Sequence, residues 1–479
     1  MVSFIINIVL VSILFFHNSW DKDPISSTSA SPTEVEDKIY YVHSGEERGK
    51  GTLEQPWNLK QAHEEFVAMI KGGDRLKHLP GIYKGKWNSK MQGKPEKPII
   101  CEPADYNDPP VFMSDNSKSI KEVHGQTFHS FASHTWYVNF IFKDEHENRI
   151  SKLDWYKDKA EKDVYSHDMV YISGVSNFKP SGIKLINCMI YDISGVGLFV
   201  SEKSANVEIY GNLIALNGFE SEARGHGPGT YMRNLEGLKL IENNIVFGNH
   251  QLGLRVYGHA HGFRFLNNVT FSNGTISAKN KGDANLFIGG SGNSKIIDNI
   301  YCEGNIAYHE PSINRPVTRI GYRGLIKRVD LINESYIGNK PIQIDKNFPP
   351  QNPTEITYNN IKYEMYDEVK VVKNKYEKNS AHVTVLNKSG KNGINVDLSG
   401  VIEKGTKIVI IDTQNFKGKP IREQEYKGGN IFLPLDLTVA SQPFGIVSSK
   451  YVHTPKEFNC FIIRAVDRNN SLIINQIHN

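Results

Sequence analysis

Apolar and polar residues alternate over short stretches in the middle of this chain, and the stretches recur at a regular interval. Alternation with a period of two is typical of β-strands rather than helices. It is clearest at residues 183–185, 207–209, 238–240 and 263–265. An asparagine accompanies each recurrence, at Asn139, Asn187, Asn212, Asn244, Asn268 and Asn299. The steps between them are 48, 25, 32, 24 and 31 residues, which indicates a unit of about 24 residues with extra loop in some units.

A fixed period with one short strand pattern in each unit is the signature of a solenoid. Three short strands and three turns per unit of this length describe an all-β fold, a right-handed parallel β-helix. Side-chain amides stacked at one corner of such a coil can hydrogen-bond along the solenoid axis, as asparagine ladders do in other stacked sheets. We therefore predict a structural ladder, and not a ligand site, made by Asn187, Asn212, Asn244, Asn268 and Asn299.

The sequence predicts four regions. Residues 1–20 contain an apolar run at 2–16 that is short for a bilayer span and lies where a signal peptide belongs, and the alternative is an uncleaved membrane anchor. Residues 21–37 are rich in Ser, Thr and Pro and predict a flexible leader. Residues 38–365 hold the solenoid with an N-terminal cap. Residues 366–479 show short strand patterns between turn signals, which predict an antiparallel β-sandwich. We expect export, to the medium, the periplasm or the cell surface.

Charge and cysteine content limit the classes of partner. The net charge is +4 over 479 residues, and no dense stripe of Lys and Arg is present, so we expect no nucleic-acid partner. The four cysteines are Cys101, Cys188, Cys302 and Cys460. Cys188 and Cys302 belong to coils too far apart for a disulfide. We expect all four to be small buried side chains.

The segment from residue 51 to residue 100 carries a series of short motifs. They are Gly51-Thr52, Pro56-Trp57-Asn58-Leu59, Gly73-Asp74, Pro80-Gly81-Ile82-Tyr83 and Pro98-Ile99-Ile100, with a helical pattern over 60–71. This segment resembles the start of secreted β-helix proteins of the polysaccharide-lyase type. The resemblance implies that the helix caps the open end of the solenoid. It is specific for the fold and weak for the activity, because this cap precedes many different sites.

The longer units carry their extra residues at one place, about 143–167, 217–229 and 273–283. Insertions at one corner of a solenoid stack into a wall that usually borders the binding face. The polar residues predicted at this corner are His167, Asp168, Asp192, Arg224, His226, His250 and Asp283.

The strand after that corner predicts two outward columns of side chains. The first column is Tyr171, Phe199, Tyr231, Arg255 and Leu286, and the second is Ser173, Ser201, Arg233, Tyr257 and Ile288. Aromatic rings stack on the apolar faces of sugars, and arginine holds a carboxylate or sulfate through two hydrogen bonds. The columns therefore favour an acidic polysaccharide as the partner.

Residues 224–234 form the sharpest single motif, with glycines that let the backbone approach a ligand closely. The stretch resembles a "GHG..Y..N" segment in secreted β-helix proteins of uncertain activity. The alternative is a glycine-rich turn with a solvated histidine.

Three functions compete, in this order. In β-elimination on a uronate polysaccharide, cations neutralise the carboxylate and a base takes the C5 proton. Arg224, Arg233 and Arg255 would neutralise the carboxylate, and His226 or His250 would be the base. The substrate would lie on Tyr171, Phe199, Tyr231, Arg255 and Tyr257. Glycoside hydrolysis by two carboxylates is second, with Asp168, Asp192, Glu220, Glu222 and Asp283 as candidates. A glycan-binding or adhesive protein without catalysis is third.

We predict no bound metal or cofactor. The resemblance allows calcium, but the sequence shows no three acidic residues on adjacent coils that would bind it. The pair His259 and His261 is interpreted as an exposed turn and not as a metal site.

Overall fold

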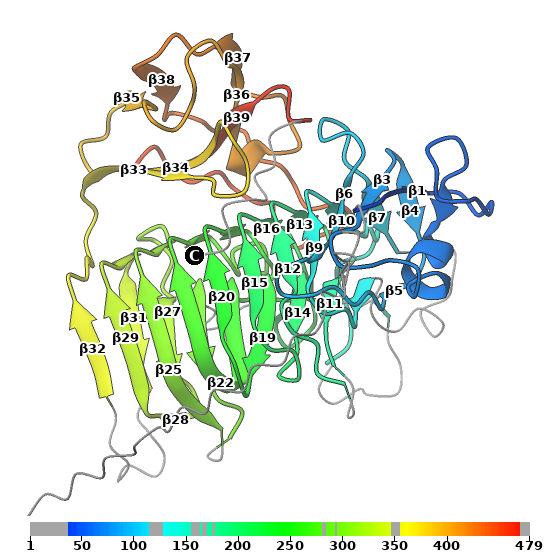
Figure 1. The fold of residues 1–479 in the computed structure, drawn as a ribbon. Coiled ribbons are helices and arrows are strands. Elements are labelled where there is room, and N and C mark those ends of the chain that lie inside the picture. The colour runs from blue at the N-terminus through cyan, green and yellow to red at the C-terminus, as the bar shows by residue number, and fades with distance from the viewer. Residues whose placement is uncertain are drawn as a thin grey trace, which may run out of the picture. The chain divides into compact units, whose positions relative to one another are not determined.

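The structure, a computed structural model, describes residues 37–114, 128–154, 163–164, 170–174, 178–279, 284–292, 295–345 and 355–469. Its main element is a right-handed parallel β-helix, in which each coil adds one short strand to each of three parallel sheets (Figure 1). The predicted fold class is confirmed.

Sheet 1 and sheet 2 share one long strand, β22, which runs from the first sheet into the second. Sheet 1 consists of β5 (Trp87–Ser89), β8 (Phe128–Ser130), β11 (Val170–Ile172), β14 (Leu198–Val200), β19 (Thr230–Asn234), β22 (Leu254–Leu266), β24 (Leu286–Gly289), β27 (Pro316–Gly321) and β31 (Lys340–Ile344). Sheet 2 consists of β1 (Ile39–His43), β2 (Trp57–Asn58), β3 (Arg75–His78), β6 (Ile99–Pro103), β9 (Thr135–Val138), β12 (Lys184–Ile186), β15 (Val207–Tyr210), β20 (Lys239–Glu242), β22, β25 (Ile296–Glu303), β28 (Leu325–Ile326), β29 (Arg328–Ile332) and β32 (Glu355–Asn359).

Sheet 3 closes each coil. It consists of β4 (Ile82–Lys84), β7 (Val111–Met113), β10 (Ile141–Lys143), β13 (Met189–Tyr191), β16 (Leu213–Ala215), β21 (Ile245–Phe247), β23 (Val269–Phe271), β26 (Ile306–Tyr308) and β30 (Ser335–Ile337). Alternate residues of all three sheets point into the solenoid, where they form one continuous apolar core. Cys101, Cys188 and Cys302 lie in this core, and all four cysteines are buried thiols, as predicted.

Two asparagine ladders hold the coils in register. In the first, Asn212, Asn244 and Asn268 each donate from the backbone and the side chain to the next amide oxygen, over 2.9–3.0 Å. The ladder continues at Asn305 and ends at the carboxylate of Glu334. A second ladder, which the sequence analysis missed, runs through Asn217, Asn249, Asn273 and Asn285.

Two predicted ladder members lie elsewhere. Asn187 precedes the ladder position and adopts a left-handed backbone with φ of 53°, as Asn243 and Asn267 do in their coils. Asn299 lies in β25, where its side chain accepts a hydrogen bond from Arg264 at 3.0 Å. The predictions for Asn187 and Asn299 were wrong, because an asparagine that adopts positive φ and a ladder asparagine look alike in sequence.

The N-terminal cap is shorter than predicted. The helical stretch expected over 60–71 is a single turn, η1 (Gln61–Glu65). The chain turns back where the Asp74 carboxylate accepts hydrogen bonds from the backbone N–H of Lys71 and of Lys38, at 2.7 and 2.8 Å. These bonds favour a turn at Lys71 over further helix.

The C-terminal segment forms two antiparallel sheets with an apolar core between them. One sheet contains β33 (Asp367–Lys373), β34 (Ser380–Asn387), β39 (Phe458–Ala465), β36 (Lys407–Asp412) and β37 (Arg422–Glu425). The other pairs β35 (Gly393–Asp397) with β38 (Asn430–Pro434), and η2 (Thr413–Asn415) follows β36.

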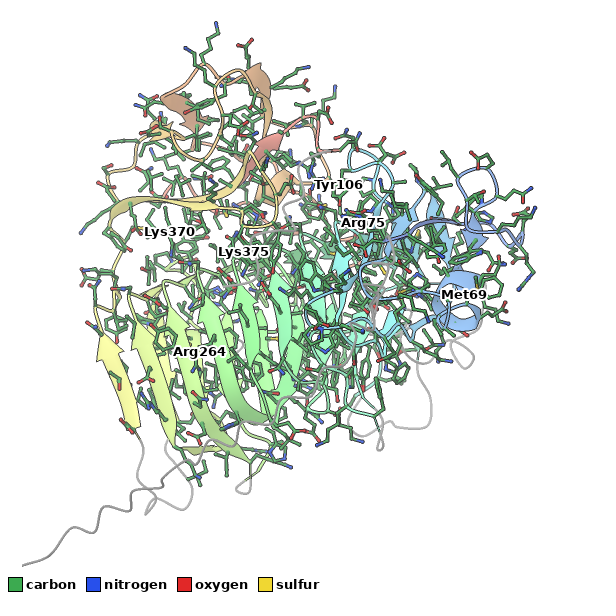
Figure 2. All side chains as sticks on the ribbon, in the orientation of Figure 1. Met69, Arg75, Tyr106, Arg264, Lys370 and Lys375 are labelled. Carbon is green, nitrogen blue, oxygen red and sulfur yellow. The ribbon has the colours of Figure 1, made fainter. Side chains whose placement is uncertain are left out.

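These sheets contact the outer side of the solenoid through apolar and charged groups. Leu386, Phe458 and Cys460 share a buried cluster with outward residues of sheet 3. Lys375, labelled in Figure 2, forms an ion pair with Glu208 at 2.7 Å. Lys417 pairs with Asp192, a residue that the sequence analysis placed at the binding corner. Asp192 is buried, so its carboxylate anchors the C-terminal segment instead of facing a substrate.

Candidate functional site

The outward side chains of sheet 1 form a continuous ladder of aromatic rings and guanidinium groups. Strand pairing places one of them on each coil, in the order His129, Tyr171, Phe199, Tyr231, Arg255, Phe287 and Arg319. Neighbouring positions add Arg233, Tyr257 and Tyr322. We call this set the arginine–aromatic ladder. All of these side chains except that of Phe287 are partly exposed.

The rings of the ladder touch one another from coil to coil. Tyr171 stacks on Phe199 with centroids 4.4 Å apart, and Phe199 meets Tyr231 edge-on at 5.1 Å. Tyr257 lies 6.2 Å from both Tyr231 and Phe287. Such contacts are favourable beyond the area they bury, so the rings form a pre-arranged surface.

Guanidinium groups lie over these rings. The Arg255 guanidinium is 4.3 Å from the Tyr231 ring centre and 4.7 Å from that of Tyr257. Arg233 lies 4.9 Å from the Tyr231 ring and donates to the Tyr231 hydroxyl at 2.5 Å. Stacking on an aromatic face fixes the plane of a guanidinium while leaving its edge available for an anion.

Arg319 and Arg233 differ in their charge balance. Arg319 forms a two-point ion pair with Asp345, at 2.7 and 3.1 Å. The described part of the chain places no carboxylate within ion-pair distance of Arg233, and the buried Nε of Arg233 has no hydrogen-bond partner there. Arg233 is partly exposed and has no internal counter-charge in the described ranges, so its guanidinium is suited to receive an external carboxylate or sulfate.

A break in strand pairing sets the shape of the site beside Arg233. Met232 pairs with Val256, but Asn234 pairs with Ala260, so β22 carries two residues more than β19 over this interval. Gly258, in this bulge, has φ of 121°, and an added Cβ would lie 3.2 Å from Arg233 Nε. Only glycine suits both the conformation and this close approach. Bulges often re-aim side chains at functional sites.

The bulge presents His259 next to two cations. Its Nε2 lies 2.6 Å from Lys295 Nζ, a distance at which the ammonium donates to the imidazole. Burial, Lys295 and Arg233 lower the pKa of His259 below its ordinary 6.5, and Glu202 acts in the opposite direction. The imidazole is therefore neutral near pH 7 and can accept a proton.

The structure brings six of the predicted residues together in the ladder. They are Tyr171, Phe199, Tyr231, Arg233, Arg255 and Tyr257. The outward columns continue differently after Arg255, because β24 pairs Phe287, and not Leu286, with it. Leu286 is buried, and Gly289 replaces the expected Ile288. The one-residue error follows the insertion at 273–283, whose length hid the register.

His226 and Arg224 lie in a short hairpin of β17 (Phe219–Glu220) and β18 (Gly225–His226). The His226 ring stacks on Phe219 with centroids 4.7 Å apart, and its Nε2 lies 2.8 Å from Ser221 Oγ. Neither residue belongs to the arginine–aromatic ladder. Their predicted catalytic roles remain predictions.

The structure corrects the expected position of His250. Its side chain has no exposed surface, and its Nδ1 lies 3.1 Å from the backbone oxygen of Asn217. Burial and the nearby Arg149 lower the pKa of His250 well below its ordinary value. A base at this position has no direct access to a polysaccharide.

The segment around His259 is not the exposed turn that the sequence predicts. It belongs to β22, the longest strand among the described residues. Nδ1 of His261 lies 3.7 Å from Oδ2 of Asp298. His167, Asp168 and Asp283 lie outside the described residues. The sequence did not predict four residues of this face, because only the strand register places them there. They are Lys295, Phe287, Arg319 and Tyr322.

Within the described ranges, no three His, Cys, Asp or Glu side chains gather as a metal site would require. The same ranges contain no helix long and apolar enough to cross a membrane.

Comparison with known proteins identifies the fold. The family described as right handed beta helix region matches residues 162–270. No curated protein matches the sequence. Among solved structures, pectate lyase Pel9A aligns over 68% of this chain and 78% of its own at 13% identity, with a TM-score of 0.46. An alginate lyase from Paenibacillus sp. str. FPU-7 aligns over 68% and 99% at 9% identity, with a TM-score of 0.37.

A GH136 lacto-N-biosidase from Eubacterium ramulus aligns over 68% of each chain at 11% identity, with a TM-score of 0.37. At these identities the likeness concerns the fold alone. The family match over residues 162–270 agrees with the right-handed β-helix that the structure shows.

Proposed function

We propose that this protein is a polysaccharide lyase that binds an acidic, uronate-containing glycan on the outer face of sheet 1. The observation that carries the proposal is Arg233, a cation on an aromatic surface with no carboxylate partner in the described structure. The rings of Tyr171, Phe199 and Tyr231 would stack on sugar faces. The proposal includes export, which the apolar run at residues 2–16 supports.

The groups beside Arg233 suit β-elimination. Arg233 and Lys295 would neutralise the uronate carboxylate, which makes the C5 proton more acidic. Once Lys295 turns from His259 Nε2 to the substrate carboxylate, Nε2 of the neutral imidazole would take that proton. Electrons from the C5–H bond then form the C4–C5 double bond as the C4–O bond to the leaving sugar breaks. The leaving oxygen takes up a proton from solvent or from the protein.

Substrate charge gives the first test. Turnover is compared on a uronate polymer, such as polygalacturonate or alginate, and on the same polymer after chemical reduction of its carboxyl groups. We expect activity on the acidic polymer only. Equal activity on both would overturn the proposal, because Arg233 and Lys295 would then have no role in recognition.

A matched pair of arginine variants gives the second test. Arg233→Met removes the proposed carboxylate ligand. Arg264→Met removes another arginine over a tyrosine, 5.5 Å from Tyr301 on sheet 2 (Figure 2). Hydrogen bonds to charged groups contribute about 1.5–3 kcal/mol. We therefore expect kcat/KM to fall about 10-fold to 100-fold in R233M and to stay unchanged in R264M. Similar values for both variants would place the site elsewhere.

A further inference from the structure

One buried lysine is hydrogen-bonded to Asn234, at the end of the bulge beside the proposed site. Lys239 is the first residue of β20, next to β22 in sheet 2 (Figure 1). Its side chain points into the solenoid and has no exposed surface. Strand pairing places Val207 and Phe263 at the same inward position in the two neighbouring coils. An apolar residue would therefore fit this position. Burying an ammonium group here is unfavourable, so its presence indicates a role other than packing.

The Lys239 ammonium holds two parts of the chain. It donates to the backbone oxygen of Ser204 and to Asn234 Oδ1, the latter at 2.9 Å. Ser204 ends the turn that carries Glu202, and its hydroxyl donates to Ser201 O at 2.8 Å within that turn. The first hydrogen bond therefore fixes the Glu202 turn from the inside.

The second hydrogen bond reaches the bulge in β22 through one amide. Asn234 Nδ2 donates to the backbone oxygens of His261 and Gly262, at 2.5 and 3.3 Å. Asn234 is also the residue at which the β19–β22 pairing resumes after the bulge. With its Oδ1 held by Lys239, the amide can present only its N–H groups to β22. The end of the bulge that carries His259 is thus tied to Lys239.

We propose that Lys239 is a positioning residue that fixes His259 and the Glu202 turn relative to Arg233. This inference rests on the proposed elimination reaction for its effect on rate, but its effect on His259 can be measured without it. Lys239 itself lies inside the solenoid and touches no substrate.

The electrostatics agree with this geometry. Burial lowers the pKa of Lys239 to about 7. The charge of Glu202 opposes this effect and raises the pKa of Lys239. Glu202 also raises the pKa of His259, whereas Lys295 and Arg233 lower it. A displacement of either the Glu202 turn or the bulge would change this balance, so the His259 titration reports on both.

Two variants break the linkage at different atoms. Lys239→Met keeps the length of the side chain and removes both hydrogen bonds, and Asn234→Ala removes the amide between Lys239 and the bulge. Lys184→Met is the control, since Lys184 is also a sheet 2 lysine but lies on the outer face, paired with Glu208 at 2.9 Å. Circular dichroism and thermal melting establish that each variant folds. If K239M does not fold, N234A carries the test.

The first readout is the His259 titration, followed by NMR on histidine-labelled protein and assigned by its loss in His259→Gln. In K239M and N234A we expect the pKa of His259 to move up toward 6.5, because a relaxed bulge exposes the ring to water and separates it from Lys295. The control should titrate as the native protein does. An unchanged His259 titration in both folded variants would overturn the proposal.

The second readout is turnover of the uronate polymer. A displacement of about 1 Å at a catalytic group can cost about 100-fold in rate. We expect kcat to fall by about that factor in K239M and N234A with little change in KM, and the double variant to lose no more than either single one. Loss of thermal stability with native kcat would leave Lys239 a merely structural residue and refute the inference. A native protein without elimination activity, combined with a shifted His259 titration, would refute the proposed function and support the positioning role.

Discussion

Glu334 ends the first asparagine ladder, and its replacement by glutamine gives a quantitative test of that ladder. Oε1 of Glu334 accepts hydrogen bonds from the backbone and side chain of Asn305, at 2.9 and 2.8 Å, and Oε2 accepts one from the Tyr336 hydroxyl at 2.7 Å. The side chain has no exposed surface. Glutamine matches its shape and can keep the bonds from Asn305.

The magnitude follows from the pKa of Glu334, which burial raises from 4.5 to about 7 against the opposing effect of its hydrogen bonds. That difference corresponds to about 3 kcal/mol. The folded-state pKa is the higher one, so the native protein loses stability as the pH rises from 4.5 through 7. Glu334→Gln has no such loss. We expect the two proteins to unfold with similar free energies at pH 4.5, and the variant to be more stable by about 3 kcal/mol at pH 8.

The assay is chemical denaturation at pH 4.5, 6, 7 and 8, with midpoints compared at equal slopes. Glu310→Gln, at an exposed glutamate, is the control and should show no pH-dependent difference. A stability difference between E334Q and the native protein that stays constant from pH 4.5 to 8 would refute the reasoning. Glu334 would then not be a buried carboxyl group at the end of the ladder.

Two further predictions concern the ladder and the site. Asn244→Leu deprives the Asn212 amide groups of their acceptor and the Ile209 carbonyl of a donor. It should lower the free energy of unfolding in urea by about 3–5 kcal/mol. The control Asn395→Leu, on an exposed position of β35, should lower it by less than about 1 kcal/mol. Because the pKa of His259 lies below 6.5, kcat/KM of the native protein for a uronate polymer should fall only below pH 6.5. In His259→Gln, kcat/KM should be much lower and should not show this fall. A native acidic limb centred above pH 6.5 would count against His259 as the base.

The strand pattern and the period were sufficient to predict the fold, because each coil repeats the same short strands with inward apolar side chains. The repeat of Asn212, Asn244 and Asn268 was readable for this reason. The second ladder was also readable, since Asn217, Asn249 and Asn273 each follow a first-ladder asparagine by five residues. Asn305 was not, because the 37-residue step from Asn268 breaks the period.

The candidate site was predictable only where strands are short and regular. Tyr171, Phe199 and Tyr231 share one position in three successive strands, and alternation alone aligns them. The pairing of His259 with Lys295 depends on a bulge with Gly258 in a left-handed conformation, and nothing in the alternation shows where the extra residues lie. The burial of His250 depends on the fold of the corner at residues 216–218, whose backbone oxygens bind His250 and the distant Arg149.

The most direct test of the central claim is the chemistry of the product. The native protein is incubated with polygalacturonate, alginate and a glucuronate-containing polymer, while absorbance at ~235 nm and reducing ends are followed together. Elimination forms an unsaturated sugar, so both signals should rise on at least one polymer and both should be lost or strongly reduced in R233M. A rise in reducing ends without the absorbance would show hydrolysis, and binding without either signal would show a glycan-binding protein; either result would contradict the proposed lyase.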